Sequence, residues 1–228
     1  MGKLIAIDGV DASGKQTHTE LLAKYFEDMG KKVLRLSFPM YNSESSALVK
    51  LYLSGSLGKN AEDVDAYAAS TFFAADRFVT YRMDWQKDYK DRETLIIADR
   101  YVSSNMIHQA SKITDLKEKD KFLDWLYDFE FSLYKIPKPD MTIFLDMPPK
   151  YGKMLICGRN NKFSGKEQLD IHERDFSYLE KSYENARYVA EKFGWETVSC
   201  IKDNAIRPID DIQSEIRILA ENLIKTRQ

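Results

Sequence analysis

Short apolar runs alternate with segments of helical period along the whole 228-residue chain. The apolar runs have the length and composition of buried strands. They predict strands at Leu4–Asp8, Lys32–Phe38, Thr94–Asp99, Met141–Asp146 and Trp195–Cys200. The segments with apolar positions three and four residues apart predict helices at Gly14–Met29, Ser45–Leu53, Glu62–Trp85, Ser103–Ala110, Glu118–Leu133, Asp170–Phe193 and Ile209–Lys225. Gly30 and Gly194 stand where glycine commonly ends a helix.

This alternation predicts an α/β protein, because parallel strands need helical crossovers. We expect a single domain over residues 1–228, built as three α/β/α layers around a five-stranded parallel sheet. Ligands of such sheets bind beyond the carboxyl ends of the strands. Candidate functional residues are therefore sought directly after each predicted strand.

The segment Gly9–Lys15 has the form Gly-x-x-x-x-Gly-Lys and lies between the first predicted strand and the first predicted helix. This order is typical of a phosphate-binding loop (P-loop), whose backbone N–H groups and helix dipole hold an anion. The alternative, a plain glycine turn, does not explain this context. The residues expected at the phosphates of ATP are Gly9, Asp11, Ala12, Ser13, Gly14, Lys15, Gln16 and Thr17.

Gln16 follows the loop lysine, where a serine or threonine usually binds Mg²⁺. An amide oxygen is a weaker ligand, so Mg²⁺ is expected to depend on carboxylates, water and substrate phosphates. Asp11 and Asp99 are the candidate metal ligands. Thr17 is better placed for an inner phosphate.

Asp99 and Arg100 follow the apolar run Leu95–Ala98, which predicts a buried central strand. At that edge an aspartate can hold Mg²⁺ or orient a phosphate, and an arginine can bind phosphate oxygens in a bidentate manner. The alternative is a salt bridge that closes the strand. Lys15, Asp99 and Arg100 are candidate catalytic residues.

Phe73, Asp76 and Arg77 lie within one predicted helix, and spacing places Phe73 and Arg77 on one face. An aromatic ring beside a fixed guanidinium suits a flat base. From spacing alone, a core phenylalanine beside an exposed ion pair is the favoured interpretation. Phe38 and Pro39 end the second strand, and Tyr41 is a candidate phosphate contact or a turn residue.

The segment Tyr151–Leu169 contains several basic and polar residues and few apolar ones. Beside a P-loop, this composition favours a basic lid over the phosphates, and a solvated loop is the alternative. Arg159 is the preferred catalytic cation of this lid, with Lys162 and Lys166 as lesser candidates.

The net charge of −2 disfavours a nucleic-acid partner, and no apolar run has membrane-spanning length. Two cysteines form no disulfide framework, which favours a cytoplasmic location. The three histidines, His18, His108 and His172, lack metal-ligand spacing and are interpreted as non-catalytic, and His108 is a candidate to lie near the base.

Taken in order, these motifs resemble the thymidylate kinase family of nucleoside-monophosphate kinases. The resemblance rests on five segments: Asp8–Lys15, Phe38–Pro39, Phe73–Arg77, Asp99–Asn105 and Phe144–Asp146. It implies dTMP and ATP as substrates, Mg²⁺ as cofactor, and a homodimer. The dTMP-binding residues that it implies are Asp11, Phe38, Pro39, Tyr41, Phe73, Arg77, Arg100, Tyr101 and Asn105.

By the same resemblance, Asp11 would bind the 3′-hydroxyl and Phe73 would stack on thymine. Arg77 would donate to O4 and Asn105 would meet the N3 side, while Tyr101 would crowd the 2′ position. Arg100, with Tyr41 nearby, would bind the substrate phosphate, and Lys15 would bridge the phosphates of both nucleotides.

Two positions depart from the family pattern. Met40 stands where many members carry an arginine, and Ala12 stands where some carry a catalytic arginine. Members without the latter resemble those that supply it from the lid, which is the reason for choosing Arg159.

The expected reaction is phosphorylation of dTMP to dTDP by ATP with Mg²⁺. A deoxynucleoside kinase is one alternative, but it needs a carboxylate base after the second strand, and no acid occurs there before Glu44. A non-catalytic nucleotide-binding regulatory module is the other, because Gln16 replaces the usual Mg²⁺ ligand.

Overall fold

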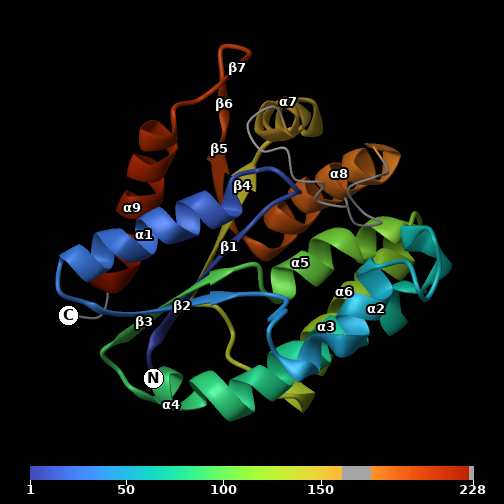
Figure 1. The fold of residues 1–228 in the computed structure, drawn as a ribbon, viewed down its shortest axis with the longest axis horizontal. Coiled ribbons are helices and arrows are strands. Elements are labelled where there is room, and N and C mark those ends of the chain that lie inside the picture. The colour runs from blue at the N-terminus through green and yellow to red at the C-terminus, as the bar shows by residue number, and fades with distance from the viewer. Residues whose placement is uncertain (161–175, 226–228) are drawn as a thin grey trace.

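The computed structural model describes residues 1–160 and 176–225. A parallel sheet with the strand order β2-β3-β1-β4-β5 forms its centre (Figure 1). The strands are β1 (Lys3–Asp8), β2 (Lys32–Ser37), β3 (Thr94–Asp99), β4 (Met141–Asp146) and β5 (Glu196–Ser199). The five predicted strands and the three-layer α/β/α class are thereby confirmed.

Helices cover both faces of this sheet (Figure 1). The α-helices are α1 (Lys15–Asp28), α2 (Ala47–Leu53), α3 (Ala66–Thr80), α4 (Gln86–Lys90), α5 (Val102–His108), α6 (Leu116–Tyr127), α7 (Pro149–Asn160), α8 (Phe176–Phe193) and α9 (Ile209–Lys225). Short 3₁₀ turns are η1 (Glu44–Ser46), η2 (Ala61–Asp63) and η4 (Ala110–Lys112). Two π-helical segments, η3 (Tyr81–Trp85) and η5 (Asp128–Leu133), extend α3 and α6.

Alternation along β1 divides the core in two. Leu4 and Ala6 pack on the face covered by α3, α5 and α6, whereas Ile5 and Ile7 pack on the face covered by α1 and α9. Side chains at successive strand positions point to opposite faces, so a central strand between two helical layers must be apolar throughout. This is why the apolar runs were recognisable in the sequence.

Several elements differ from the prediction. The predicted helix Glu62–Trp85 begins only at Ala66 and ends in a π-helical turn. Residues 149–160 form α7, so the first part of the expected lid is a helix, and residues 161–169 lie outside the described residues. A two-stranded hairpin, β6 (Ile201–Lys202) and β7 (Ala205–Ile206), was not predicted, because each strand is too short to show a period.

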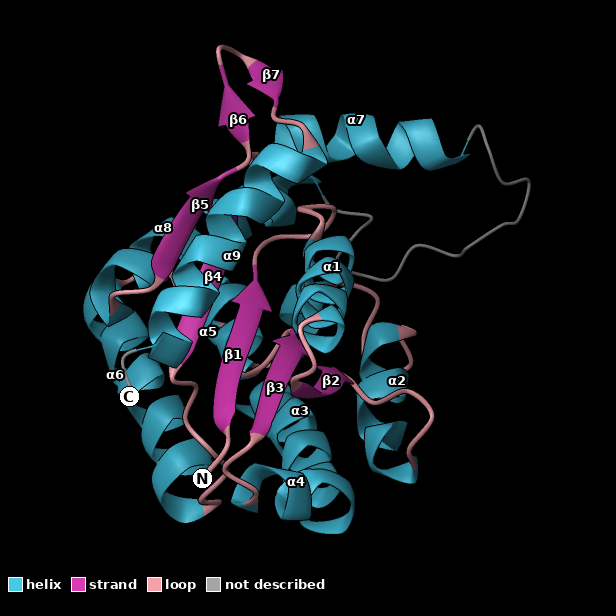
Figure 2. Cartoon of the chain, turned by 90° about the vertical axis from the view of Figure 1, so that its left-hand side faces the viewer, coloured by secondary structure: helices cyan, strands magenta, loops and turns pink. Residues whose placement is uncertain are grey.

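Both glycines expected to end helices have positive φ, 75° at Gly30 and 63° at Gly194, which confirms that prediction. Figure 2 shows the β6–β7 hairpin and α7 beyond the carboxyl ends of the strands. None of the helices within the described ranges combines the length and hydropathy needed to cross a membrane.

Candidate active site

The P-loop Gly9–Lys15 joins β1 to α1. At Gly9, with φ 158°, an added Cβ would lie 2.7 Å from Ser13 Oγ and 2.9 Å from Leu145 O, so only glycine fits there. Gly9 and Ser13 therefore pack beneath the loop, and neither lines the cavity above it. Gly14, with φ 87°, starts α1 in the left-handed conformation that glycine favours.

Two cavities meet at the carboxyl edge of the sheet. The loop cavity lies over the P-loop and includes Ala12, Gly14, Lys15, Gln16, Thr17, Ser37 and Asp99 in its lining. The helix cavity lies beside α3 and α5 and includes Leu53, Phe73, Arg77, Tyr101, Ser104, Asn105, His108 and Gln109 in its lining. Asp11, Phe38, Pro39, Tyr41 and Arg100 line both, so the two cavities share one junction.

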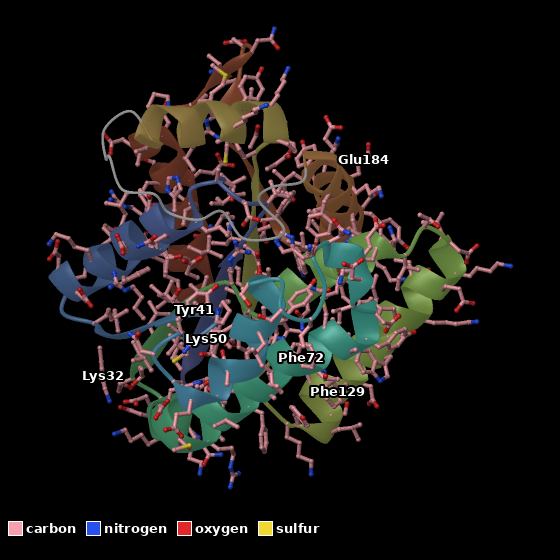
Figure 3. All side chains as sticks on the ribbon, turned by 45° about the vertical axis from the view of Figure 1, so that its right-hand side comes forward. Lys32, Tyr41, Lys50, Phe72, Phe129 and Glu184 are labelled. Carbon is pink, nitrogen blue, oxygen red and sulfur yellow. The ribbon has the colours of Figure 1, made fainter. Side chains whose placement is uncertain are left out.

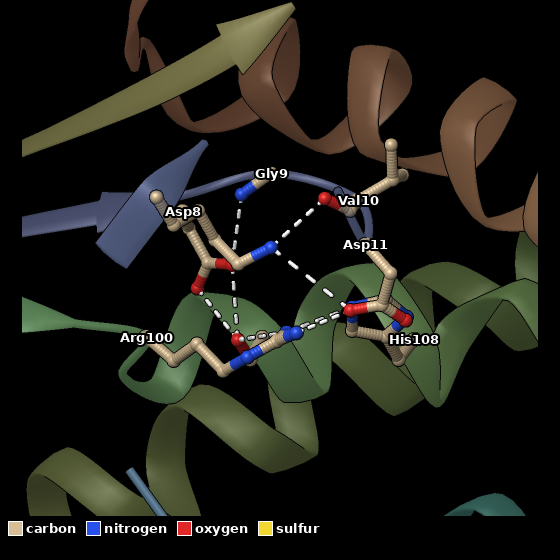
Figure 4. Close-up of polar contacts among 8 residues, drawn as sticks. Asp8, Gly9, Val10, Asp11, Arg100 and His108 are labelled. Atoms are coloured by element: carbon tan, nitrogen blue, oxygen red, sulfur yellow. Dashed lines mark hydrogen bonds and ion pairs between the residues drawn. The ribbon is translucent and has the colours of Figure 1, made fainter. Parts of the chain in front are cut away.

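An ion pair between Asp11 and Arg100 occupies this junction (Figure 4). His108 Nε2 lies 3.3 Å from Arg100 Nη1, and Lys15 Nζ lies 4.0 Å from Asp11 Oδ1. Burial opposes the ionised form of Asp11, but Arg100, Lys15 and His108 together hold the pKa of Asp11 well below its usual value. The junction therefore holds an anionic carboxylate that is already paired with cations.

Lys15 Nζ donates to the P-loop carbonyl of Val10 at 2.8 Å. Burial and, secondarily, Arg100 lower the pKa of Lys15 to about 8, although Asp11 and Asp8 oppose the shift. A lysine in this state is partly neutral in the folded protein and becomes fully cationic when an anion binds beside it.

Asp8, at the end of β1, has a structural role. Its carboxylate accepts hydrogen bonds from the Ser103 and Ser104 hydroxyls at 2.7–2.9 Å and from the Gly9 N–H at 2.9 Å. These bonds fasten the P-loop to the first turn of α5, where a carboxylate also meets the positive end of the helix dipole.

Asp99 is different, because its Oδ1 is buried without a hydrogen-bond partner among the described residues. Burial raises the pKa of this carboxyl, and nearby Arg100 and Lys15 counteract part of the effect. Within the described part of the chain no cluster of three acidic, histidine or cysteine side chains forms a complete metal cage. One free carboxylate oxygen beside a phosphate site is nevertheless what Mg²⁺ uses when phosphates and water complete its shell.

Gln16 is exposed, and its amide nitrogen donates to Glu20 at 3.2 Å. Thr17 is half-buried and, like Gln16, lines the loop cavity.

Phe73 and Arg77 share the face of α3 that borders the helix cavity. The favoured reading from spacing, an exposed ion pair beside a core phenylalanine, is wrong. Arg77 is 1% exposed and forms a bidentate ion pair with Glu130. Asp76 holds the chain after β2, since its carboxylate accepts from the Met40 N–H at 2.8 Å and from the Ser45 hydroxyl.

Tyr101 lines the helix cavity but has no exposed surface, and its hydroxyl donates to the Pro137 carbonyl at 2.9 Å. That hydroxyl is thus hydrogen-bonded within the core, so only the ring of Tyr101 faces the cavity, and the expectation that Tyr101 crowds the 2′ position stays a prediction. Phe38 packs on Tyr101 with ring centroids 5.7 Å apart. Tyr41, labelled in Figure 3, is half-exposed and lines both cavities.

Arg159 lies in the last turn of α7, but the structure does not describe its side chain. Lys162 and Lys166 lie outside the described residues. The start of α7 touches the P-loop. A Cβ added to Gly152 would lie 3.3 Å from Asp11 O and 3.4 Å from Ala12 Cβ, so a glycine lets the helix approach this closely.

Sequence reasoning missed Ser104, Gln109 and Leu53 in the cavity lining, and it missed Glu130. Ser104 and His108 are one helical turn apart on α5, a spacing that shows which residues face the cavity once Arg100 is placed. Glu130 also carried a signal, because it continues the apolar positions Phe122, Leu123 and Leu126 at helical spacing.

A P-loop that opens onto a second cavity across an arginine–aspartate junction fits an α/β kinase with a separate site for the phosphate acceptor. The thymidylate kinase family model matches residues 7–216. The chain therefore belongs to the thymidylate kinase family, and it is a kinase phosphotransferase.

Relatives agree with this assignment. A thymidylate kinase of Mycobacterium tuberculosis is 33% identical over 175 residues, which are 75% of this chain and 78% of the relative. A probable thymidylate kinase of Thermococcus gammatolerans is 29% identical over 227 residues, 98% of both chains. Probable thymidylate kinase 1 of Saccharolobus solfataricus is 28% identical over 223 residues, which are 98% of this chain and all of the relative.

Proposed function

We propose that this kinase transfers the γ-phosphoryl group of ATP to dTMP, giving dTDP and ADP in the supply of dTTP. The observation that carries this proposal is the junction shared by the loop cavity and the helix cavity. Two nucleotides that occupy these cavities meet at their phosphate ends, beside Lys15 and Arg100. Phosphoryl transfer between them needs positioning and charge neutralisation, with no covalent intermediate.

ATP occupies the loop cavity. Backbone N–H groups of residues 14–17, at the amino end of α1, hold its phosphates, and the Lys15 ammonium reaches the outer ones. The N–H groups of Gly9 and Ser13 donate to Asp8 and to the Val10 carbonyl instead. The adenine lies towards the β6–β7 hairpin, which the Tyr151 hydroxyl joins to α7 by donating to Asn204 O at 3.2 Å.

The base of dTMP occupies the helix cavity. Phe73 stacks on the ring, Arg77 donates to O4 and Asn105 meets N3, while Asp11 binds the 3′-hydroxyl. The phosphate lies at the junction, where Arg100 and Tyr41 bind it together with the walls formed by Phe38 and Pro39. A phosphate there competes with Asp11 for the Arg100 guanidinium.

The residues present fit Mg²⁺. Asp99 offers a free carboxylate oxygen, whereas Asp11 is already paired with Arg100 and Lys15. When bound, Mg²⁺ supplies charge neutralisation at the phosphates. We assign Asp99 as its main protein ligand and Asp11 as a secondary one. Gln16 contributes little, because its amide bonds to Glu20.

Lys15 and Arg100 offset the repulsion between the two anionic substrates. Arg159 supplies the further cation from α7, and residues 151–169 act as a lid that excludes water from the junction. The active unit is a cytoplasmic homodimer. Its interface is formed by the exposed leucines Leu48 and Leu51 of α2, together with Leu57.

An ADP-release assay with ATP and Mg²⁺ tests this function. We expect rapid ADP formation with dTMP and none above background with thymidine, because the helix cavity has Asp11 as its lining carboxylate and Asp11 is paired with Arg100. Turnover of thymidine in place of dTMP would identify a nucleoside kinase. ATP binding without ADP release in the presence of dTMP would identify a regulatory module. Either result overturns the proposal.

A further inference from the structure

Glu130 is a completely buried carboxylate that the proposed chemistry does not use. It lies on the π-helical segment η5, four residues after Leu126. It therefore continues the line of buried residues that Phe122, Leu123 and Leu126 form on α6. An ionised group at an apolar core position is costly unless partners satisfy it. Irregular π-helical turns are frequent at functional sites, so the partners of Glu130 are informative.

Glu130 binds two residues of the helix cavity. Its Oε2 accepts from Arg77 Nε at 2.7 Å and its Oε1 accepts from Arg77 Nη2 at 2.6 Å. Its Oε1 also lies 3.5 Å from Asn105 Nδ2. The bidentate pair joins α3 to the extension of α6, whose side-by-side course is visible near Phe72 and Phe129 in Figure 3. A bidentate contact fixes the plane of a guanidinium as well as its charge.

The pair fixes which N–H groups of Arg77 remain to donate into the cavity. Three of its five N–H bonds are used, two by Glu130 and one by the Tyr101 carbonyl at 3.3 Å. The remaining two belong to a group that has no acceptor atom. Arg77 lines the cavity and is otherwise enclosed, so a bound ligand must offer it an acceptor.

The same carboxylate orients the amide of Asn105. Asn105 Nδ2 donates to the Ser70 carbonyl at 3.2 Å and faces Glu130 Oε1. Both neighbours are acceptors only, so the amide nitrogen must face them and the amide oxygen is left for a ligand. Asn105 therefore presents an acceptor beside the Arg77 donor.

We propose that Glu130 is a positioning residue that sets the hydrogen-bond polarity of the helix cavity, an inference that rests on the proposed function. A donor beside an acceptor matches a ring carbonyl next to a ring N–H, the edge shared by thymine and uracil. Cytosine offers an amino group next to an unprotonated ring nitrogen, which is the opposite polarity. Binding it would leave buried donors and acceptors unpaired on both sides, a mismatch that strongly penalises a ligand.

The test compares dTMP with dCMP as phosphate acceptors in the wild-type chain and in Glu130→Gln. Glu130 Oε1 faces both Arg77 Nη2 and Asn105 Nδ2, and its Oε2 accepts from Arg77 Nε. The single acceptor oxygen of glutamine cannot keep all three contacts, and its NH₂ group then meets a donor of Arg77. We expect KM for dTMP to rise about tenfold or more and the preference for dTMP over dCMP to fall by at least as much. We expect kcat to change by less than about threefold, because Glu130 does not touch the reacting phosphates.

A second variant covers loss of folding, because Glu130→Gln removes a charge that a buried guanidinium needs. Glu130→Asp keeps the charge but withdraws the carboxylate by one methylene. We expect KM for dTMP to rise by a smaller factor than in Glu130→Gln and kcat again to change little. Glu118→Gln is the matched control on the same helix, since Glu118 pairs with Lys121 on the exposed surface. We expect this control to match the wild-type chain in both constants.

The outcomes separate this inference from the proposed function. If the wild-type chain does not phosphorylate dTMP, the proposed function fails, and calorimetry with dTMP and dCMP then decides the polarity of the cavity. If the wild-type chain uses dTMP but folded Glu130→Asp keeps its KM and its dTMP preference, this inference alone is overturned. A drop in kcat without a change in KM or selectivity would equally overturn it, because it would indicate a general structural role.

Discussion

Lys15 is a buried lysine whose binding of phosphate depends on its protonation state. Its pKa of about 8 lies below the ordinary lysine value because of burial and the neighbouring Arg100. Only the protonated amine binds a triphosphate as an ion pair. The free protein therefore has the cation ready below pH 8 and must take up a proton to bind ATP above it.

We expect the affinity for ATP to be nearly constant below pH 8 and to fall about tenfold for each pH unit above it. Calorimetric titrations at pH 7.5 and pH 9.5 measure this, because ATP itself does not titrate in that interval. Lys15→Arg is the control, since arginine stays charged throughout and should give a flat profile. A wild-type affinity that is unchanged between the two pH values would contradict the assignment.

Arg100 shows how a residue role depends on partners that are remote in sequence. Asp11, Asp8 and Asp99 outweigh its burial and keep its pKa above the usual value, so it is charged at every relevant pH. Its φ of 64° is uncommon for a residue with a side chain, as is the 61° of Ala12. Ala12 lines the loop cavity and Arg100 lines both cavities, so both uncommon conformations lie at the candidate site, where strained backbone is often found.

At the scale of elements, α7 links the P-loop to the residues expected to close over it. Gly152 packs on the backbone of Asp11 and Ala12, and Arg159 follows two helical turns later, about 10 Å along the axis. Because α7 starts on the P-loop, Arg159 at its far end belongs to the lid that we propose over the junction.

We expect Arg159→Ala to lower kcat about 10³-fold or more while KM for dTMP stays within a few-fold, because the arginine acts on the transferring group only. Steady-state kinetics measure both constants, and Arg159→Lys, which keeps the charge without the bidentate geometry, should lie between. A turnover within a few-fold of the wild-type rate in Arg159→Ala would show that the cation comes from another residue.

The hydrophobic pattern predicted the bounds of some elements and missed others. β3 and β4 have the predicted bounds, because their apolar runs are buried on both faces and end sharply at Asp99 and Asp146. The hairpin β6–β7 and the π-helical turns were missed, since they are short and arise from local hydrogen bonding that no hydrophobic period encodes.

At the scale of the whole molecule, apolar side chains that remain exposed indicate candidate interfaces, whereas buried ones belong to the core. Six of the seven residues of α5 are buried, so this helix belongs to the core. Leu48 and Leu51, three residues apart on α2, are 47% and 45% exposed, and Leu57, which follows α2, is 43% exposed. Exposed leucines grouped in this way are typical of an interaction surface.

We expect sedimentation to give twice the mass of the chain at micromolar concentration and Leu51→Glu to shift the protein to the monomer, because a buried unpaired charge disfavours association. Ile218→Glu is the matched control. Ile218 is 60% exposed on α9, across the sheet from α2, and its replacement should leave the dimer intact. A monomeric wild-type chain would contradict the proposed interface.

The sequence by itself determined the sheet, its flanking helices, the P-loop and the residues that follow each strand. Those features depend on local period, on glycine and on strand ends, all of which are readable along one dimension. Only the tertiary structure decided which side chains meet. It brought Glu130 to Arg77 across 53 positions and Arg100 to Asp11 across 89, and it buried the Tyr101 hydroxyl. Such contacts depend on how helices pack over the sheet, and no local pattern specifies that packing.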